Sequence, residues 1–499
     1  MSSPSSSPPE AFQRGLDAAQ GGNWSQAATH FLEGCQQQHG PSWINAAICL
    51  ERSDQHDSCD QLLAEALLRY PNEPALLLHA GQRALARDQL AAAEVHLRRA
   101  LDQQPQLSGA QHQLVVCLLE QQRPREALDA LEPLLLADPE NPQALYNRAL
   151  ALKASADLQG ALEQFNQLAE RHPDWPGLDT NRGALLLQLG RQREGWPLYE
   201  ARFRDTPEIC AAPALPRYRT ELGRVPQLLL VAEQGLGDSL QFLRYGPALR
   251  SCCTTLHLAV QPQLVALAES SGLYDRVLST TDLQVRDVQD ALAAQECHWL
   301  PLLSAAALAG TGQPLPPPLT LNPQAVADWG KRLGPKRTRR RIGLVWQGNP
   351  AAERGQQRGR SLPLSALQPL LHDPELEWLS LQKGPGSEQL KALCLRQVFH
   401  PAQALIDPEW DFGAIAAILS HCDLLLSTDT AITHLAGAYG LPSVLLLKAV
   451  PDWRWGITGS HCPWYPRHHL VRQRSGETWD QTLARLSASG LLHNPATSR

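Results

Sequence analysis

The first two-fifths of the chain repeats a pattern of small, bulky and helix-ending residues at a fixed interval. Four prolines stand 34 residues apart: Pro71, Pro105, Pro139 and Pro173. Three alanines keep the same spacing, each twelve residues before a proline: Ala93, Ala127 and Ala161. A bulky residue follows four positions later, as Leu131 follows Ala127 and Phe165 follows Ala161. The pattern predicts paired helices with a small residue where they cross and a proline closing the second helix.

This unit resembles the tetratricopeptide repeat, a 34-residue helix-turn-helix. Gly15, Ala27 and Phe31 mark an earlier unit, and a last one runs from near Trp175 through Tyr199, so we count about six units between residues 9 and 205. One helical pair cannot cover its own apolar face, and stacked pairs form a solenoid whose groove binds a peptide or protein. We expect the groove to recruit the acceptor or a partner protein. The alternative is that the solenoid only dimerises or rigidifies the protein.

After Pro226 the pattern changes to short apolar runs separated by helical periodicity. The runs predict strands at 227–232, 255–260, 276–279, 297–300, 342–346, 377–381, 424–427 and 444–447. Helical patterns lie at 239–249, 411–419 and 430–438. Alternating strands and helices predict two doubly wound α/β lobes, with ligands beyond the carboxyl ends of the strands.

Composition sets the domain limits. The first residues are rich in Ser and Pro, 313–323 is rich in Pro, and 331–341 is basic without interleaved aromatic residues, which favours a linker over a phosphate or RNA patch. The expected parts are a disordered tail (1–8), the solenoid (9–205), a first lobe (226–312), a linker (313–340), and a second lobe with a C-terminal crossing segment (341–485).

Charge and hydropathy exclude several classes of protein. Lys and Arg number 44 against 50 Asp and Glu, a net charge of -6, so no general positive field attracts nucleic acid or an anionic membrane. No run approaches the ~18 apolar residues of a transmembrane segment, and the N-terminus lacks the features of a secretory signal. The 11 cysteines are scattered without a C-x-x-C pair, which argues against a zinc site or a disulfide framework. We expect a cytoplasmic protein.

The first candidate for chemistry is the turn at 235–238, between a strand and a helix. Glycines, Gly237 among them, let the backbone approach a ligand, and the helix N-terminus carries a partial positive charge. The third glycine of a dinucleotide fingerprint is absent. Asp238 places a carboxylate at the helix start, facing the cleft between the lobes, and its alternative role is to cap the helix. Glu233, five residues earlier, is a second carboxylate.

The second candidate is the segment at 427–431 with His434. Hydroxyls and free backbone N–H groups where a strand enters a helix form a cradle for a pyrophosphate, and Asp429 is placed to accept a hydrogen bond from a ribose or sugar hydroxyl. The alternative is that Thr428 or Asp429 caps the helix and His434 is an ordinary core histidine.

Two further groups follow strands. Gln347, Asn349 and Lys383 stand at strand ends, where the lysine is placed to neutralise a phosphate. Trp453, Arg454, Trp455 and Tyr465 follow the last strand predicted. They either stack on a base or sugar or pack the C-terminal segment against both lobes, and we favour packing.

Six segments, in order, resemble the heptosyltransferase-like family 9 glycosyltransferases, in the bacterial branch where the transferase module follows tetratricopeptide repeats. They are residues 232–245, 342–350, 360–364, 379–384, 427–440 and 451–456 with 463–466. The resemblance implies an α solenoid followed by a GT-B fold, with two doubly wound Rossmann-like lobes. It also implies an inverting, metal-independent transfer of a hexosyl or heptosyl group, with a nucleotide sugar as substrate and no cofactor.

Within that family the Gly-Asp turn supplies the proposed general base, which corresponds here to Asp238, and Glu233 stays open as a second candidate base. The resemblance also implies that the first lobe (226–312) is on the acceptor side and the second lobe (341–485) on the nucleotide-sugar side. In that family the segment that matches 427–440 binds the nucleotide sugar. Its residues correspond here to Asp429, Thr430, Ala431 and His434, and Thr428 and Lys383 are further candidates for the same site. The sugar, the nucleotide and the glycan or protein acceptor stay open. The alternatives are a scaffold with a degenerate transferase module and a protein O-glycosyltransferase resembling the O-linked N-acetylglucosamine transferases, whose likeness is architectural only.

Overall fold

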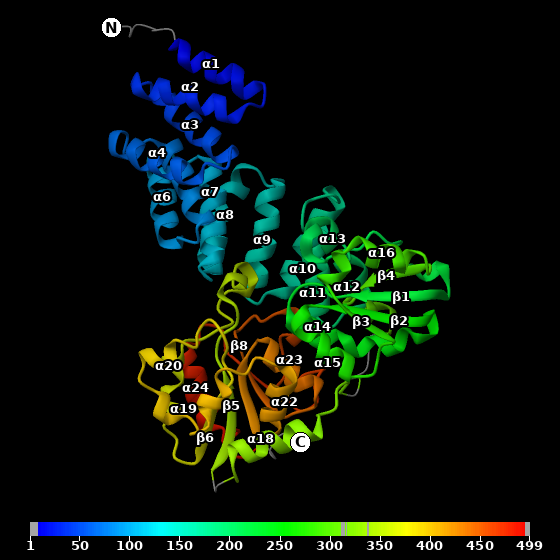
Figure 1. The fold of residues 1–499 in the computed structure, drawn as a ribbon. Coiled ribbons are helices and arrows are strands. Elements are labelled where there is room, and N and C mark those ends of the chain that lie inside the picture. The colour runs from blue at the N-terminus through cyan, green and yellow to red at the C-terminus, as the bar shows by residue number, and fades with distance from the viewer. Residues whose placement is uncertain (1–7, 311–314, 316, 337–338, 495–499) are drawn as a thin grey trace. The chain divides into compact units, whose positions relative to one another are not determined.

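The computed structural model describes residues 8–310, 315, 317–336 and 339–494 (Figure 1). The chain divides into two compact units, Met1–Gln164 and Phe165–Arg499. Apart from Pro8, the tail expected at 1–8 lies outside the described residues, as do residues 313, 314, 316, 337 and 338 of the expected linker. None of the described helices is both long and apolar enough to cross a membrane.

The first unit consists of helices that pack against their neighbours along the chain. They are α1 (Glu10–Gln20), α2 (Trp24–Gln36), α3 (Gly40–Arg52), α4 (His56–Arg69), α5 (Pro74–Ala86), α6 (Leu90–Gln103), α7 (Ser108–Glu120), α8 (Pro124–Ala137), α9 (Pro142–Ala154) and the start of α10 (Leu158–Arg171). Small residues lie where helices approach, since a Cβ added to Gly81 would come 2.7 Å from Leu97. Ala127 is fully buried and Leu131 is 1% exposed, as the repeat pattern predicts.

The turn inside each helical pair recurs at the same 34-residue period. Asp54, Asp88, Gln122 and Ala156 adopt φ angles of 60°, 60°, 59° and 71°. Gly190, in the second unit, continues the series with a φ of 76°. Side chains other than glycine seldom occupy this left-handed region. The positive φ angle therefore recurs with the 34-residue repeat, at positions whose residue types alone do not reveal it.

The second unit begins with helices that belong to the predicted solenoid range. They are the end of α10, α11 (Leu178–Gln188), α12 (Gln192–Tyr199) and α13 (Arg202–Asp205). Helices α11 and α12 pack closely, because a Cβ on Gly183 would lie 2.5 Å from the backbone nitrogen of Tyr199. Gln188 donates to the carbonyl of Pro451 at 2.9 Å, and Trp196 meets Trp453 with ring centroids 5.5 Å apart. This helical pair therefore packs on the α/β part of the chain.

The first lobe is a parallel sheet of four strands in the order β3-β2-β1-β4. Its strands are β1 (Val225–Val231), β2 (Cys253–Val260), β3 (Arg276–Ser279) and β4 (Cys297–Pro301), and its helices are α14 (Leu236–Phe242), α15 (Val265–Ser270), α16 (Arg286–Ala293) and α17 (Ser304–Leu308). The helix expected at 239–249 is wrong in its second half. The α-helix ends at Phe242 and a 3₁₀ helix, Leu243–Cys252, contains Pro247, which lacks the N–H of an α-helical bond.

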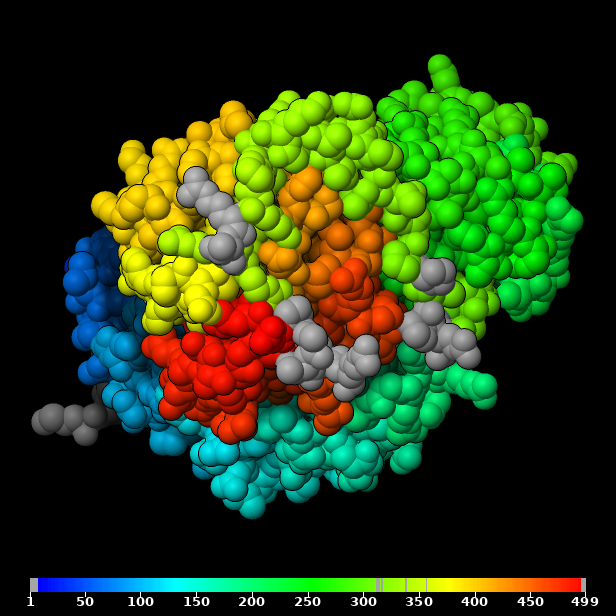
Figure 2. Space-filling model, turned by 90° about the horizontal axis from the view of Figure 1, so that it is seen from below, coloured from blue at the N-terminus to red at the C-terminus, as the bar shows by residue number. Residues whose placement is uncertain are grey.

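The second lobe is a parallel sheet of five strands in the order β6-β5-β7-β8-β9. The strands are β5 (Arg340–Val345), β6 (Leu376–Ser380), β7 (Leu424–Thr428), β8 (Ser443–Leu447) and β9 (His468–Arg472). The helices are α19 (Gln368–Leu371), α20 (Gln389–Ala392), α21 (Gln403–Ile406), α22 (Phe412–Ser420), α23 (Ala431–Ala438) and α24 (Trp479–Ala488). Figure 2 shows the red C-terminal segment against the yellow elements of this lobe, where Leu483 and Leu486 of α24 join its core.

Part of the range expected to be a linker is a packed helix, α18 (Pro323–Leu333). The side chain of Asn322 caps it by accepting from the backbone nitrogens of Gln324 and Ala325. Trp329 and Leu333 are buried, and the helix packs on α22. The Pro-rich and basic composition on either side hid this short amphipathic segment.

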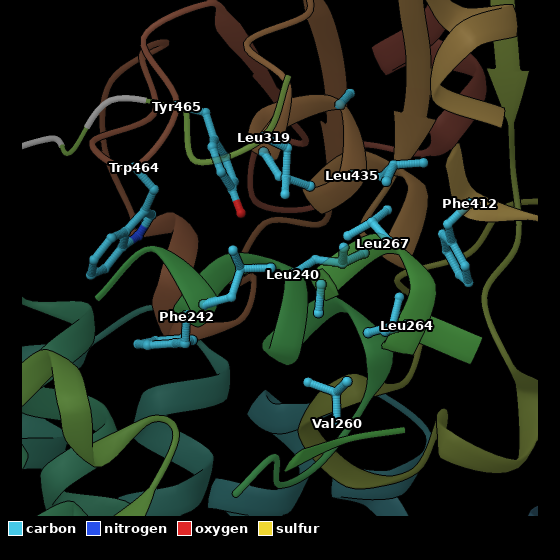
Figure 3. Packing of buried hydrophobic residues seen from close by; sticks show 14 of the residues in the cluster. Leu240, Phe242, Val260, Leu264, Leu267, Leu319, Phe412, Leu435, Trp464 and Tyr465 are labelled. Atoms are coloured by element: carbon cyan, nitrogen blue, oxygen red, sulfur yellow. The ribbon is translucent and has the colours of Figure 1, made fainter. Parts of the chain in front are cut away.

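An apolar core joins the two lobes through α14 and α23 (Figure 3). Leu240 and Phe242 from α14 lie on one side, and Leu435 from α23 with Trp464 and Tyr465 on the other. All five are buried, at 9% exposure or less. The expected fold class, a helical solenoid followed by two parallel-sheet α/β lobes, is confirmed, and the core holds the start of α14 against the start of α23.

Candidate active site between the two lobes

The strand order places the predicted site residues at the switch points of both sheets. Strand β5 has β6 on one side and β7 on the other, and β1 has β2 and β4. Ligands of open parallel sheets bind beyond the carboxyl ends of the strands at such points. Asp238 follows β1 and Asp429 follows β7, one from each lobe.

Asp238 is held at both oxygens of its carboxylate. Its Oδ2 accepts from the backbone nitrogen of Gly235 at 2.8 Å, which caps α14, and its Oδ1 accepts from Arg454 Nη2 of the other lobe. The side chain is 16% exposed. Burial raises the pKa of Asp238, and the Arg454 guanidinium opposes that rise. Asp238 therefore both caps α14 and lies in the site between the lobes, so the two alternatives from the sequence coexist.

Arg454 is the centre of the polar contacts between the lobes. Its Nη1 donates to Asp452 Oδ1 at 2.7 Å and its Nη2 donates to Gln234 Oε1 at 3.2 Å as well as to Asp238. Asp452 accepts a further bond at Oδ2 from Gln357 Nε2, at 2.9 Å. Burial acts to raise the pKa of Asp452, but the guanidinium and these hydrogen bonds hold it below its usual value.

A hollow of about 220 Å³ lies at the carboxyl ends of β7 and β8, partly open to solvent. It is lined by Gln357, Arg360, Asp429, Leu446, Leu447, Lys448, Pro451 and Asp452. Burial lowers the pKa of Lys448 to about 8. Burial, with the nearby Asp452 carboxylate, raises the pKa of Asp429 to about 6. Two cations and two carboxylates thus share a confined space in which charge interactions are strong.

His434 is a buried, neutral histidine beside this hollow. Its Nδ1 is 2.8 Å from the Tyr465 hydroxyl and its Nε2 is 3.9 Å from Asp429 Oδ1. Its ring stacks on Trp455 with centroids 5.2 Å apart. Burial lowers its pKa well below the usual value. Gly237 lies against the ring, because a Cβ there would come 2.7 Å from His434 Cδ2.

The structure places Thr430 as the N-cap residue of α23, so the alternative that Thr428 or Asp429 caps this helix is wrong. The side chain of Thr430 makes no capping hydrogen bond. Thr428 ends β7, and Ala431 is the first residue of α23. Ser427 Oγ lies 3.1 Å from Thr430 Oγ1. The buried hydroxyl of Thr428 has no hydrogen-bond partner within the part of the chain that the structure describes.

Three of the predicted site residues, Gln347, Asn349 and Lys383, make hydrogen bonds to other groups of the protein. Gln347 accepts from Gln389 Nε2 at 2.9 Å, and Asn349 accepts from the backbone nitrogen of Ala351 at 3.1 Å. The ammonium of Lys383 donates to the carbonyls of Ile406 and Asp407, at 2.5 and 3.1 Å, beyond the end of α21. None of the three lines the hollow, where the cations are Arg360 and Lys448 instead.

The aromatic residues proposed as a stacking surface are buried. Trp453, Trp455 and Tyr465 are 7%, 1% and 2% exposed. Trp453 packs on Trp196 and, at 5.8 Å between centroids, on Tyr199. In this structure their rings form the core between the lobes, which is the packing role that the sequence favoured.

Glu233, the second candidate base, is 2% exposed and hydrogen-bonded at both carboxylate oxygens. Its Oε2 accepts from Arg202 Nε at 2.8 Å, and its Oε1 accepts from Arg202 Nη2 at 3.0 Å and from the backbone nitrogen of Leu303 at 3.1 Å. Three of the carboxylate's four acceptor positions are taken and the side chain is buried, so Glu233 is less suited than Asp238 to accept a substrate proton.

Sequence reasoning missed four polar residues of the hollow: Gln357, Arg360, Lys448 and Asp452. Lys448 directly follows the apolar run of β8, as Lys383 follows β6, so the same strand-end signal applied to both. Arg360 lay inside a matched segment without an assigned role. Asp452 likewise lay inside a matched segment, 451–456, without an assigned role, and Gln357 ends a short 3₁₀ helix (Gly355–Gln357) that no periodic pattern marks.

Comparisons with known proteins identify both parts of the chain. Residues 84–151 match the family model described as tetratricopeptide repeat, and residues 383–483 match the model of glycosyltransferase family 9 (heptosyltransferase). Protein FlbA of Caulobacter vibrioides is 28% identical over 388 residues, 72% of this chain and 62% of that protein. A DnaJ homolog subfamily C member 3 homolog of Dictyostelium discoideum is 30% identical over 94 residues, 18% of this chain and 19% of that protein.

Two solved structures that resemble part of the chain are a tetratricopeptide repeat protein from Parabacteroides merdae and pilF of Pseudomonas aeruginosa. The first is 14% identical with a TM-score of 0.36, covering 39% of this chain and 78% of that one. The second is 18% identical with a TM-score of 0.33, covering 40% and 90%. By the two family models, the chain carries a tetratricopeptide-repeat region and, towards its C-terminus, a family 9 glycosyltransferase domain.

Proposed function

We propose that the protein transfers a sugar from a nucleoside diphosphate donor to an acceptor hydroxyl, with inversion and without a metal ion. One observation carries the proposal. A carboxylate from the first lobe, Asp238, meets the second lobe next to a hollow lined by Arg360 and Lys448 at the start of α23. A base on one side and cations on the other are the two parts that a single displacement at an anomeric carbon needs.

The reaction follows from the charges. Asp238 accepts the proton of the acceptor hydroxyl as its oxygen bonds to the anomeric carbon, while the bond to the diphosphate oxygen breaks on the opposite side. Arg360, Lys448 and the partial positive charge at the start of α23 stabilise the departing nucleoside diphosphate. Two side-chain cations supply the charge neutralisation that a divalent ion supplies in metal-dependent transferases. One base suffices for inversion, because no covalent sugar intermediate forms.

Asp429 is suited to bind the donor rather than to act as base. It lines the hollow, and with a pKa of about 6 it is ionised at neutral pH. An ionised carboxylate among the phosphate-binding cations would repel a diphosphate but accepts hydrogen bonds from sugar hydroxyls. Thr428 and Thr430 then offer hydroxyls to the phosphates, as the sequence resemblance implies.

The hollow is too small for a whole nucleotide sugar in this structure. Its 220 Å³ includes space open to solvent, so the enclosed volume is far below the roughly 300–1,000 Å³ of ordinary ligand pockets. The contact of Gly237 with His434 closes the space between the starts of α14 and α23. Donor binding therefore requires the start of α14 to move away from the start of α23.

We infer that the repeats recruit the acceptor, a glycan-bearing or protein molecule, or a partner protein. The repeat family binds proteins in its groove, and the likeness to protein FlbA extends over both parts of the chain. Because the chain aligns with only 62% of that relative, its activity is not carried over. A cytoplasmic location stays a prediction.

The test uses purified full-length protein and a panel of UDP-glucose, UDP-N-acetylglucosamine, GDP-mannose and ADP-heptose, with release of nucleoside diphosphate as the readout. Isothermal titration with ADP and UDP identifies the nucleobase of the donor. We expect binding of one nucleotide and slow donor hydrolysis that Asp238→Asn abolishes, since asparagine still caps Gly235 but accepts no proton. Absence of nucleotide binding and of turnover would instead favour the alternative that the protein is a scaffold with a degenerate transferase module.

A further inference from the structure

The contact between Asp238 and Arg454 is the inner end of a chain of hydrogen bonds that reaches α12. Tyr199, the last residue of α12, accepts at its hydroxyl from Gln234 Nε2 at 3.2 Å. Gln234 Oε1 accepts from Arg454 Nη2, also at 3.2 Å, and the same Nη2 donates to Asp238. A helix of the predicted solenoid range is thus connected to the proposed base through two side chains.

Gln234 is fixed in both backbone and side chain. Its φ is 62°, a left-handed conformation that is uncommon for a residue other than glycine. Its backbone nitrogen donates to Ile209 at 3.1 Å and its carbonyl accepts from Gln261 Nε2 at 3.3 Å. Because arginine only donates, the amide oxygen of Gln234 must face Arg454, which leaves the amide nitrogen for Tyr199.

Arg454 is held on its other sides as well. Its guanidinium lies 4.4 Å from the ring centroid of Trp453, and its side chain is 7% exposed. Asp452 binds its Nη1. Trp453 in turn packs on Trp196 and Tyr199 of α12. The guanidinium that holds one oxygen of Asp238 therefore has little freedom to move.

We propose that Tyr199, Gln234 and Arg454 are positioning residues for Asp238, so that the last helical pair before the lobes helps to align the base. The proposal rests on the proposed function, in which Asp238 accepts the proton. With Oδ2 bonded to Gly235 and Oδ1 to Arg454, the carboxylate cannot rotate about its Cβ–Cγ bond, and its remaining lone pairs point in fixed directions.

The charged and titratable groups that surround this relay come from every element packed on it. They are Asp238 (α14), Arg360, Asp429, His434 (α23), Asp452, Arg454, Tyr199 (α12) and Arg202 (α13), whose guanidinium lies 4.8 Å from the Tyr199 ring centroid. Arg454 opposes the desolvation of Asp238, so its removal raises the pKa of the base. A base must be deprotonated to act, and the acidic limb of the rate profile then moves to higher pH.

The test is the pH–rate profile of donor hydrolysis with the panel above, for Tyr199→Phe, Arg454→Met and Arg454→Lys. We expect Tyr199→Phe to lower kcat about 3- to 10-fold with KM unchanged and the acidic limb in place, as for one lost hydrogen bond. Arg454→Met lowers kcat about 100-fold or more and moves the limb to higher pH. Arg454→Lys, which keeps the charge, restores the limb and part of the rate.

Tyr218→Phe is the matched control. Tyr218 is a buried tyrosine of the same unit whose hydroxyl donates to the carbonyl of Gly223 at 3.0 Å, away from Arg454. We expect it to leave kcat and the limb unchanged, although it too loses a buried hydrogen bond. Should Arg454→Met fail to fold, Arg454→Lys and Tyr199→Phe decide the matter.

The outcomes separate the two proposals. The positioning role is wrong if Tyr199→Phe has no more effect than Tyr218→Phe and the Arg454 variants leave the acidic limb of the pH–rate profile unchanged. If Asp238→Asn is inactive in the same experiment, the proposed transferase function is still supported. If the wild-type protein turns over no donor of the panel, both proposals fall.

Discussion

Replacing Glu233 with glutamine separates the two acidic residues that follow β1. Glu233 accepts three N–H groups, two from Arg202 and one from Leu303, and both ion-pair partners are 2% exposed. A glutamine has one acceptor and one donor, so in either orientation its amide N–H₂ faces an N–H donor. Arg202 then keeps only the more exposed Glu200, 2.9 Å from Nη1, as a carboxylate partner.

The loss of stability follows from these contacts. Breaking a buried ion pair by removing one partner costs about 3–5 kcal/mol, and the remaining Glu200 favours the lower end, about 3 kcal/mol. The second unit has about 335 residues (Phe165–Arg499), for which an unfolding entropy of about 2.1 cal/mol/K per residue gives about 700 cal/mol/K. The melting temperature of Glu233→Gln should therefore fall by about 4 °C.

The assays are differential scanning calorimetry and donor hydrolysis, with Asp238→Asn measured beside Glu233→Gln. We expect Glu233→Gln to keep kcat within about threefold below its melting range. Asp238→Asn should lose about 10²–10⁴ in kcat, the usual contribution of a general base, with a smaller change in melting temperature because Asp452 still compensates Arg454. If Glu233→Gln loses activity as Asp238→Asn does and melts normally, the assignment of the base to Asp238 is refuted.

Three further predictions concern the hollow and its supports. Gly237→Ala should cost about 1–3 kcal/mol, because its Cβ meets the fixed ring of His434, whereas Gly40→Ala, with nothing within 4 Å, should not destabilise; equal melting temperatures would contradict this. Lys448→Met should weaken binding of ADP or UDP about 10- to 100-fold by titration calorimetry, and wild-type affinity should fall as pH rises through about 8, where Lys448 loses its proton; a flat pH dependence would argue against its role. Burial depresses the pKa of His468 to about 4, so protonation favours the unfolded chain and up to about 3 kcal/mol of stability is lost as pH falls from about 6.5 to 4; His468→Gln should flatten this decline, and an unchanged slope would exclude His468 as its source.

Much of the fold could be predicted because its signals are local. A buried parallel strand needs a continuous apolar run, and the runs at 276–279 and 444–447 coincide with β3 and β8 almost residue for residue. Strand β9 was missed because His468 and His469 make it look polar, although it pairs with β8 at the edge of the sheet. Helix α18 was missed for the same kind of reason, since prolines and basic residues flank its short apolar stripe.

The site was predicted in part. The strand ends pointed to Asp238 and Asp429, because parallel strands bring their carboxyl ends to one edge. The sequence did not reveal that Arg454, 216 residues from Asp238, binds it, or that Tyr199 of a repeat-like helix joins the same network. Nothing in the local pattern around Gln234 or Asp452 marks them as partners of that arginine.

Lys383 and Lys448 show which features the sequence determined and which the tertiary structure decided. By itself the sequence determined the repeats, the strands and the residues that follow each strand, because hydrophobic periodicity and turn chemistry act between near neighbours along the chain. Lys383 and Lys448 both follow an apolar run, so the sequence could not rank them. Only the order β6-β5-β7-β8-β9 decided, because it puts β6 at an edge and β8 beside β7, where Lys448 faces Asp429 across the hollow.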